Sequence, residues 1–293
     1  MEYLAVINRD KKKIPEWLRK ELENLGKVVY VRGRIENILE RESYDAVVAV
    51  GGDGTHSAVI NYAIDNNTPV VLVAWGSGGD FAKALGIENK SEKDARKVLR
   101  SLREGTFREG RFDVLEFESD AGKRYSTVGV HIGLFAATIN MSAGWKRAVK
   151  SVLKGKAYIP LGILTLLTYK EVPGEIHVNG RRIYKGRITT VHIANSPYTA
   201  AGALVSPESR IDDGRFEFMI ANIRKYEGAI LAEKMKKGEH IGERGIHYIT
   251  GARWGKIILE RPADIGYDGE YFGKTEKVKV KIKEKAARIL LPT

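Results

Sequence analysis

The sequence of 293 residues contains no cysteine. This absence excludes disulfide bonds, thiolate metal sites and cysteine nucleophiles. The sequence also lacks a run of about 20 apolar residues, the length needed to span a bilayer, and its first ten residues resemble a strand rather than a signal peptide. Its six histidines show no metal-ligand spacing, so we expect them in core or surface roles. We therefore expect a cytoplasmic protein.

Acidic residues are fewer than basic ones. The chain has 49 Lys and Arg against 37 Asp and Glu, which gives a formal net charge of +12. Such a charge favours nucleic acid, an anionic membrane surface or a polyanionic small molecule as the partner. The basic residues show neither aromatic interleaving nor a nucleic-acid motif, so nucleic acid is not the expected partner. The length suggests two domains, each with its own core.

Strands and helices alternate in the first third of the chain. Strands are expected at 3–8, 27–31, 46–50 and 69–73, and helices at 14–25, 35–41, 57–65, 80–85 and 92–103. This alternation predicts an α/β N-terminal domain over residues 1–104, built on an open parallel sheet. Ligands of such sheets bind at the carboxyl ends of the strands.

After Gly105 the apolar residues follow a period of two. Strands are expected at 106–118, 124–130, 175–179, 182–195, 215–220, 246–250, 256–260 and 277–283, with a helical stretch at 134–168. The pattern predicts a second, mainly antiparallel domain over residues 105–285, a β-sandwich, while a strand at 286–293 returns to the first domain. The Asn179-Gly180 pair is a hairpin signal.

An apolar segment at 157–168 interrupts these strands. It is too short to cross a membrane, so we expect either a core helix or a lipid-facing flap.

A glycine-rich turn follows the apolar strand at 46–50. Gly51, Gly52 and Gly54 permit close backbone approach, so main-chain N–H groups can surround an anion at the start of the next helix. Asp53, between two of these glycines, is expected to face the ligand and to help place Mg²⁺ on phosphates. An Asx turn is the structural alternative for this residue.

Two hydroxyl residues accompany the first turn. Thr55 and Ser57 either donate to phosphate or cap the following helix, and these two roles are compatible.

A second glycine turn follows the strand at 69–73. Gly76, Gly78 and Gly79 give access to the backbone, and Ser77 offers a hydroxyl. Asp80 either accepts a hydrogen bond from a substrate hydroxyl or serves as a helix N-cap. The sequence has no Gly-x-x-x-x-Gly-Lys-Ser/Thr motif, which excludes a P-loop enzyme.

The motifs taken together resemble the diacylglycerol kinase catalytic-domain family, which includes sphingosine kinases and bacterial lipid kinases. The resemblance covers nearly the whole chain, and the first motif alone is shared with NAD kinases and phosphofructokinase-like enzymes. The matching segments are 51–55, 76–82, 201–203 with Pro207, 211–214 and 268–270.

By this resemblance, ATP binds through residues 51–57 and the turn at Ser77, with Asn8 and Arg32 nearby. Glu270 is implied as the general base that takes the proton of a lipid hydroxyl. Asp268 is implied to orient Glu270 or to bind metal, whereas a hairpin turn is the structural alternative for Asp268-Gly269.

The resemblance also implies a structural Mg²⁺ site at Asp213, completed by main-chain oxygens near Arg210 and Arg215, where an ordinary turn is the alternative. This chain departs from the family at two positions of the second turn. Ser77 stands where the family usually has Thr, and Gly79 stands where it usually has Asn, which removes a side chain expected at the acceptor lipid.

These features predict an ATP-dependent lipid kinase that transfers the γ-phosphate to a hydroxyl of a diacylglycerol-like lipid. Its basic surface predicts peripheral association with an anionic membrane, and a homodimer is compatible with the sequence. An NAD kinase is the alternative enzyme, and a nucleotide-binding regulator without turnover is the alternative without catalysis.

Overall fold

The computed structural model describes residues 2–8, 14–31, 44–76, 78–148 and 158–293. The chain divides into two compact units. The first comprises Met1–Asp113 together with Lys285–Thr293, and the second comprises Val114–Glu284. Strands β5 (Phe107–Ser119) and β14 (Glu270–Pro292) have residues in both units.

A parallel sheet forms the centre of the first unit. Its strands follow the order β14-β4-β3-β1-β2, and each neighbouring pair is parallel. Strands β3 and β4 are buried along their whole length, as expected of strands covered on both faces. The predicted α/β domain with an open parallel sheet is confirmed. The bounds are β1 (Tyr3–Asn8), β2 (Lys27–Val31), β3 (Ala46–Gly51) and β4 (Val70–Ala74).

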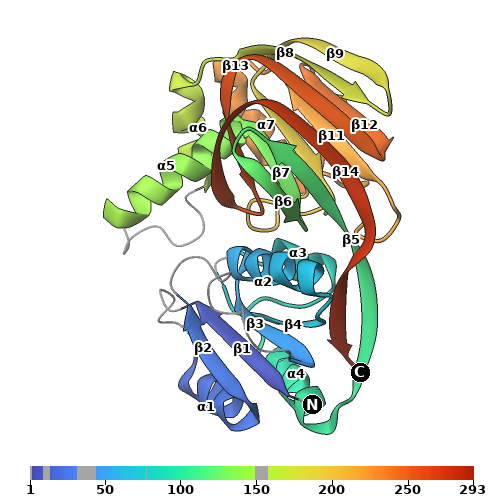
Figure 1. The fold of residues 1–293 in the computed structure, drawn as a ribbon. Helices are drawn as coiled ribbons and strands as arrows, with labels where there is room; N and C mark the ends of the chain where they lie inside the picture. The colour runs from blue at the N-terminus through green and yellow to red at the C-terminus, as the bar shows by residue number, and fades with distance from the viewer. Residues whose placement is uncertain (1, 9–13, 32–43, 77, 149–157) are drawn as a thin grey trace. The chain divides into compact units, whose positions relative to one another are not determined.

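Helices cover both faces of this sheet (Figure 1). Helices α1 (Glu16–Leu25) and α4 (Glu92–Glu104) lie on one face, and α2 (Asp53–Asn66) and α3 (Asp80–Ala84) lie on the other. The N-cap of α4 is Ser91, whose Oγ accepts a hydrogen bond from the Asp94 N–H at 3.1 Å, and its C-cap is Gly105 in the left-handed region. The helix expected at 35–41 lies outside the described residues.

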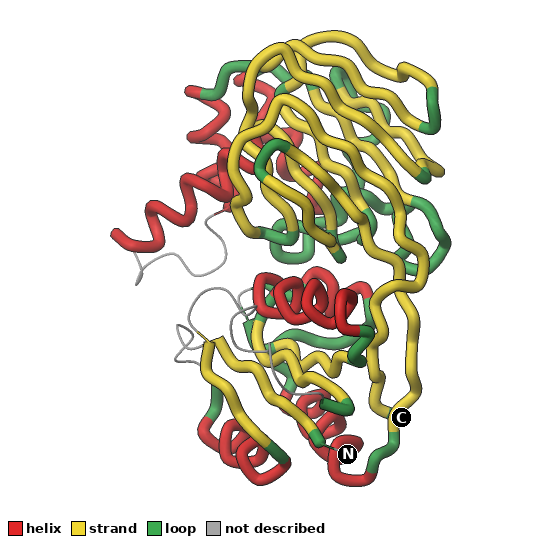
Figure 2. Tube along the Cα trace, viewed as in Figure 1, coloured by secondary structure: helices red, strands yellow, loops and turns green. Residues whose placement is uncertain are grey.

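Strands dominate the second unit (Figure 2), and its strand pairs are antiparallel. The order is β12-β11-β10-β7-β13-β14. In addition, β8 pairs with β13 and with β9, and β5 pairs with β14 and with β6. The mainly antiparallel second domain is thereby confirmed. The further bounds are β6 (Gly122–Ser126), β7 (Gly129–Gly133), β8 (Val172–Val178), β9 (Arg181–Ile188), β10 (Thr190–Ala194), β11 (Phe216–Ala221), β12 (Ile246–Ala252) and β13 (Trp254–Tyr267).

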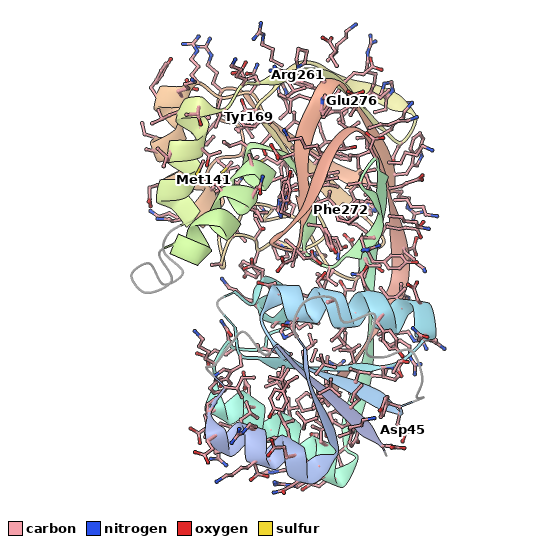
Figure 3. All side chains as sticks on the ribbon, turned by 60° about the vertical axis from the view of Figure 1, so that its left-hand side comes forward. Asp45, Met141, Tyr169, Arg261, Phe272 and Glu276 are labelled. Carbon is pink, nitrogen blue, oxygen red and sulfur yellow. The ribbon has the colours of Figure 1, made fainter. Side chains whose placement is uncertain are left out.

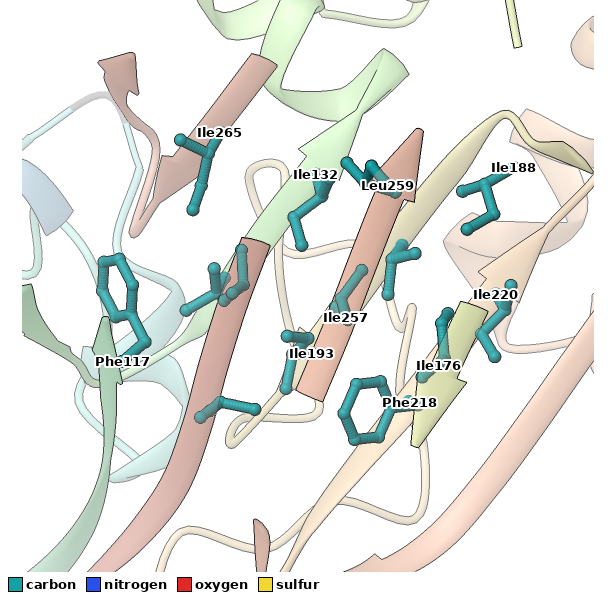
Figure 4. Packing of buried hydrophobic residues seen from close by; sticks show 14 of the residues in the cluster. Phe117, Ile132, Ile176, Ile188, Ile193, Phe218, Ile220, Ile257, Leu259 and Ile265 are labelled. Carbon is teal, nitrogen blue, oxygen red and sulfur yellow. The ribbon is translucent and has the colours of Figure 1, made fainter. Parts of the chain in front are cut away.

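The long strand β13 takes part in both layers of the sandwich. Its first half pairs with β8 from Gly255 to Leu259, and its last residues pair with β7 from Ile265 to Tyr267. The pairing with β14 is irregular between Ile258 and Ala263, where the strand changes partner. Figure 4 shows the apolar side chains enclosed between these strands, among them Ile132, Ile176, Ile193, Phe218 and Ile257.

Helices α5 (Leu134–Ala148), α6 (Tyr158–Thr168) and α7 (Gly228–Lys237) belong to the second unit, together with the 3-10 helix η1 (Lys225–Glu227). The helical stretch predicted at 134–168 corresponds to α5 and α6, whereas α7 was not predicted. Asn179 and Gly180 join β8 to β9 with φ of 47° and 85°, which confirms the predicted hairpin. Among the described helices, none has the length and apolarity to cross a membrane.

The bounds of several predicted elements were wrong, and two cases stand out. The single strand expected at 182–195 is two strands, β9 and β10, separated at Thr189, whose N–H donates to the Ala221 carbonyl at 2.8 Å. The helix α2 begins at Asp53, four residues earlier than expected, with Gly52 as its N-cap.

Candidate functional site

The two predicted glycine turns contact each other at the carboxyl ends of β3 and β4. The Trp75 N–H donates to the Gly51 carbonyl at 2.7 Å, which extends the strand pairing into the turns. A Cβ atom on Gly76 would lie 2.3 Å from the Gly52 Cα and 2.5 Å from the Gly52 nitrogen. Only glycine fits at position 76, because any side chain would push the two turns apart.

Asp53 links the first turn to the second. It is the first residue of α2, and its Oδ2 would lie 2.3 Å from a Cβ atom on Gly78. The carboxylate therefore lies against the backbone of the second turn. A half-buried carboxylate between two glycine turns is a suitable ligand for a hard cation.

Thr55 and Ser57 lie inside the first turns of α2. Their side chains are buried, and neither hydroxyl has a hydrogen-bond partner among the described residues. The N-cap of α2 is Gly52, so the capping alternative for these two residues is wrong. Buried hydroxyls without partners are rare, and a ligand oxygen beside the helix N-terminus would satisfy them.

The side chain of Asn89 fixes the second turn. Its Oδ1 accepts from the Gly76 N–H at 3.1 Å, and its Nδ2 donates to the Gly76 carbonyl at 3.2 Å. A Cβ atom on Gly79 would lie 3.3 Å from the Asn89 Cβ, so Gly79 and Asn89 pack closely. Asn89 was not predicted as a site residue, because a polar residue before a helix indicates a turn but not which group its side chain contacts.

Of the other site residues predicted in the first unit, the structure describes some and not others. Asp80 is buried and is the first residue of α3, whose N-cap is Gly79, so the capping alternative for Asp80 is wrong. Asn8 ends β1 and pairs with Val31, and its side chain is not described. Ser77 and Arg32 lie outside the described residues.

Asp268 is buried at the β13–β14 hairpin of the second unit, with 2% of its surface exposed. Its Oδ1 accepts hydrogen bonds from the Ser126 hydroxyl at 2.6 Å and from the N–H groups of Val128 at 2.8 Å and Gly129 at 3.2 Å. Its Oδ2 accepts from the N–H of Thr127 at 3.0 Å and from the hydroxyl of the same residue at 3.2 Å. The carboxylate therefore holds the hairpin against the start of β7.

The turn itself has the hairpin geometry given as the alternative for Asp268-Gly269. Asp268 and Gly269 have φ of 46° and 79°, and Tyr267 pairs with Glu270 across them. Glu270 follows as the first residue of β14, and its side chain is exposed. The backbone position of Glu270 is thus set by a buried anchor two residues earlier.

Asp213 lies in a local turn. Its Oδ1 accepts from the Arg215 N–H at 3.0 Å, and Gly214 has φ of 71°. Among the described residues, no cluster of three or more His, Asp or Glu side chains is placed to hold a metal ion. The metal site at Asp213, Arg210 and Arg215 stays a prediction.

Two histidines that are 61 residues apart stack in the core of the second unit. His131 of β7 and His192 of β10 are directly opposite in register, with ring centroids 4.7 Å apart and planes 9° from parallel. Their Nδ1 atoms are 3.1 Å apart, so one donates to the other. Burial lowers the pKa of His131 to about 4, which keeps this ring neutral at physiological pH.

A pocket of about 420 Å³ lies between α5 and α6, and two of its lining residues, Met141 and Tyr169, are labelled in Figure 3. Burial raises the pKa of Tyr169 to about 12, so its hydroxyl stays protonated. The lining mixes aliphatic, hydroxyl, amide and cationic groups, which suits an amphipathic ligand. The lining residues are Ala137, Asn140, Met141, Thr165, Thr168, Tyr169 and Lys170.

Comparison with known proteins finds relatives among kinases. Residues 24–111 match the model of the diacylglycerol kinase catalytic domain, and residues 135–291 match the model of the YegS C-terminal NAD kinase beta sandwich-like domain. A diacylglycerol kinase of Bacillus subtilis is 26% identical over 235 residues, which cover 78% of this chain and 72% of that protein.

Solved structures share the fold. A diacylglycerol kinase from Bacillus anthracis aligns with a TM-score of 0.66 and 14% identity, over 100% of this chain and 97% of that chain. An NAD kinase from Archaeoglobus fulgidus, solved in complex with ATP, aligns with a TM-score of 0.57 and 14% identity, over 99% of this chain and 93% of that chain. Because the second family model spans more than half of the sequence, the chain belongs to the diacylglycerol kinase catalytic-domain family with a YegS-type C-terminal β-sandwich.

Proposed function

We propose that this protein is an ATP-dependent lipid kinase, which transfers the γ-phosphate of ATP to a hydroxyl of a diacylglycerol-like lipid. One observation carries the proposal. The two glycine turns contact each other at Gly52 and Gly76, with Asp53 against Gly78, where parallel sheets bind ligands.

The first unit supplies the nucleotide site. Backbone N–H groups of the two turns donate to phosphate oxygens, and the N-terminus of α2 adds a favourable dipole. The buried hydroxyls of Thr55 and Ser57, which have no hydrogen-bond partner among the described residues, gain one in ATP. Mg²⁺ bound with ATP would offset the charge of the phosphates, and Asp53, whose carboxylate lies against Gly78, would hold it.

The second unit supplies the base. Glu270 takes the proton of the acceptor hydroxyl, whose oxygen forms a bond to the γ-phosphorus while the bond to the bridging β–γ oxygen breaks and ADP leaves. Asp268 is a positioning residue, because its five hydrogen bonds fix the hairpin on which Glu270 lies.

The acceptor is an amphipathic lipid. The pocket between α5 and α6 offers aliphatic surface beside Thr165, Thr168 and Lys170, a combination that matches a lipid with a polar head. Relatives named as diacylglycerol kinases support this acceptor class.

The first experiment incubates the protein with γ-labelled ATP and either lipid extract or NAD. A lipid kinase moves label into the organic phase, whereas an NAD kinase leaves all new product in water. Label that appears only in NADP excludes the lipid kinase.

The second experiment replaces Glu270→Gln and, as a matched control, the exposed Glu260→Gln of β13. Loss of a general base lowers kcat by about 10²- to 10⁴-fold with little effect on the Kd of ATP. The control variant is expected to keep wild-type turnover. A nucleotide-binding regulator would bind ATP and show no turnover in any of the three proteins.

A further inference from the structure

Four large apolar side chains are exposed on neighbouring helices of the second unit. Leu164 and Leu167 of α6 are 42% and 52% exposed, and Tyr226 of η1 and Ile230 of α7 are 69% and 66% exposed. We refer to these four residues as the α6–α7 face. Among the described residues, the other exposed large apolar side chains are Tyr30 and Trp254, on β2 and β13.

The helices that carry this face pack directly on each other. A Cβ atom on Gly228, the first residue of α7, would lie 2.3 Å from the Leu166 Cδ2, so α6 and α7 are in close contact there. The Lys225 Nζ donates to the carbonyl of Leu167, which ties η1 to the end of α6. Because these contacts join the elements, the exposed side chains belong to one continuous surface.

Each helix has buried apolar residues on its inner side and exposed apolar residues on its outer side. Leu166, Leu231 and Met235 are buried together in one cluster on the inner side. Leu164 and Leu167 are three residues apart, so both lie on one side of α6. Tyr226 of η1 and Ile230 of α7 are both exposed, and η1 leads directly into α7. Exposed apolar residues that are grouped in this way mark an interaction site, whereas scattered ones do not.

Basic residues border the apolar ones. Residues 224–237 contain five basic and two acidic side chains, a net charge of +3. Lys170 lies two residues beyond the end of α6, and the exposed Lys236 and Lys237 end α7. Apolar side chains that insert among acyl chains, bordered by Lys and Arg, are the pattern of helices that bind anionic bilayers. Tyr226 adds an aromatic ring whose hydroxyl accepts from Arg224 at 2.6 Å, as suits the headgroup level.

We propose that the α6–α7 face docks on the surface of an anionic lipid bilayer. The proposal rests on the lipid kinase activity proposed above, because α6 also lines the pocket assigned to the lipid. A docked α6 places that pocket at the membrane surface, from which an amphipathic acceptor enters without crossing water.

The test measures flotation of the full chain with vesicles of phosphatidylcholine, alone or in an equimolar mixture with phosphatidylglycerol. The wild-type protein is expected to float with the mixed vesicles, and less so as salt is raised. The double variant Leu167→Gln/Ile230→Gln is expected to lower the partition coefficient at least tenfold. The matched control Trp254→Gln, which removes an exposed ring of β13, is expected to change it less than twofold.

A second pair of variants separates local charge from net charge. Lys236→Glu/Lys237→Glu lies at the border of the face, and Lys93→Glu/Lys97→Glu lies on exposed positions of α4 with the same change in net charge. Only the first pair is expected to lower binding to mixed vesicles at least tenfold. Equal effects of both pairs, unchanged binding of the double Gln variant, or absence of wild-type binding each overturn the proposal. Melting temperatures check that every variant is folded.

Activity on detergent-dispersed lipid distinguishes this proposal from the proposed function. If the wild-type protein binds mixed vesicles through this face but never phosphorylates dispersed lipid, the kinase assignment fails and the docking surface stands. If the double Gln variant phosphorylates dispersed lipid at the wild-type rate and loses activity only on vesicles, the docking surface is supported.

Discussion

The side-chain amide of Asn89 bonds both backbone groups of Gly76, accepting from its N–H at 3.1 Å and donating to its carbonyl at 3.2 Å. This pair of hydrogen bonds replaces the strand pairing that ends at Trp75. The second glycine turn is therefore held from one side by Asn89 and from the other by the contact with Gly52.

Replacing Asn89→Ala is expected to lower the free energy of unfolding by about 1–3 kcal/mol, because two hydrogen bonds of about 1 kcal/mol each are lost. The freed turn is also expected to weaken ATP binding about tenfold, since the backbone N–H groups lose their fixed geometry. Urea denaturation and titration calorimetry measure the two effects.

The control for this change is Asn66→Ala. Asn66 donates from Nδ2 to the Tyr62 carbonyl within α2 and is exposed, so its removal should cost less than about 0.5 kcal/mol. Loss of stability in Asn89→Ala with unaltered ATP affinity would mean that the turn holds the fold and not the nucleotide.

Gly76→Ala is expected to destabilise the protein by about 1–3 kcal/mol or more, because the new methyl group meets the Gly52 Cα at 2.3 Å. The control is Gly162→Ala of α6, which is expected to raise the free energy of unfolding. Nothing lies within 4 Å of its Cβ position, and alanine favours helix over glycine by about 1 kcal/mol. Calorimetric melting compares the two. A tolerated Gly76→Ala would contradict the close contact of the turns.

Asp268→Asn tests the hairpin anchor. Asn tolerates the left-handed φ of 46°, so the backbone is kept, but its NH₂ group faces N–H donors and not acceptors. We expect a loss of about 3 kcal/mol or more and a fall in kcat, because Glu270 is no longer held. The exposed Asp212→Asn should be neutral in both urea denaturation and turnover. A fully stable, fully active Asp268→Asn would remove the positioning role.

Glu217 gives the protein a defined pH dependence of stability. Burial raises the pKa of this carboxyl from 4.5 to about 7, against the lowering effect of the hydrogen bond from Ser209. The folded state therefore binds this proton more tightly than the unfolded state does. The resulting contribution to the free energy of unfolding is fully present below pH 4.5, falls as the pH rises, and is lost above pH 7. A pKa shift of this size changes the free energy of unfolding by up to about 3 kcal/mol.

Glu217→Gln should remove this slope. The difference in unfolding free energy between wild type and variant, measured in urea at intervals from pH 4 to pH 8, is expected to change between pH 4.5 and pH 7 and to be flat above pH 7. Ser209→Ala serves as the control, because it removes the lowering hydrogen bond and should move the midpoint of the slope upward. A difference that does not vary with pH would show that Glu217 titrates alike in both states.

The failures of prediction have physical causes. Helix α7 was missed because buried Leu231 and exposed Ile230 are adjacent, which blurs the helical period of the apolar residues. The start of α2 was predicted too late, because a glycine-rich stretch is typical of a turn. In the structure Gly54 belongs to the helix.

Local signals in the sequence determined the alternation of the described strands and helices in the first unit, the two glycine turns and the hairpins at Asn179-Gly180 and Asp268-Gly269. Each of these depends on neighbours a few residues apart, so the chain specifies it before it folds. Tertiary structure alone decided that Gly76 lies on Gly52, and that His131 stacks on His192. The glycines meet because the parallel strands β3 and β4 pair in one register, and the histidines stack because the antiparallel strands β7 and β10 pair in one register. No local sequence pattern specifies these registers across tens of residues.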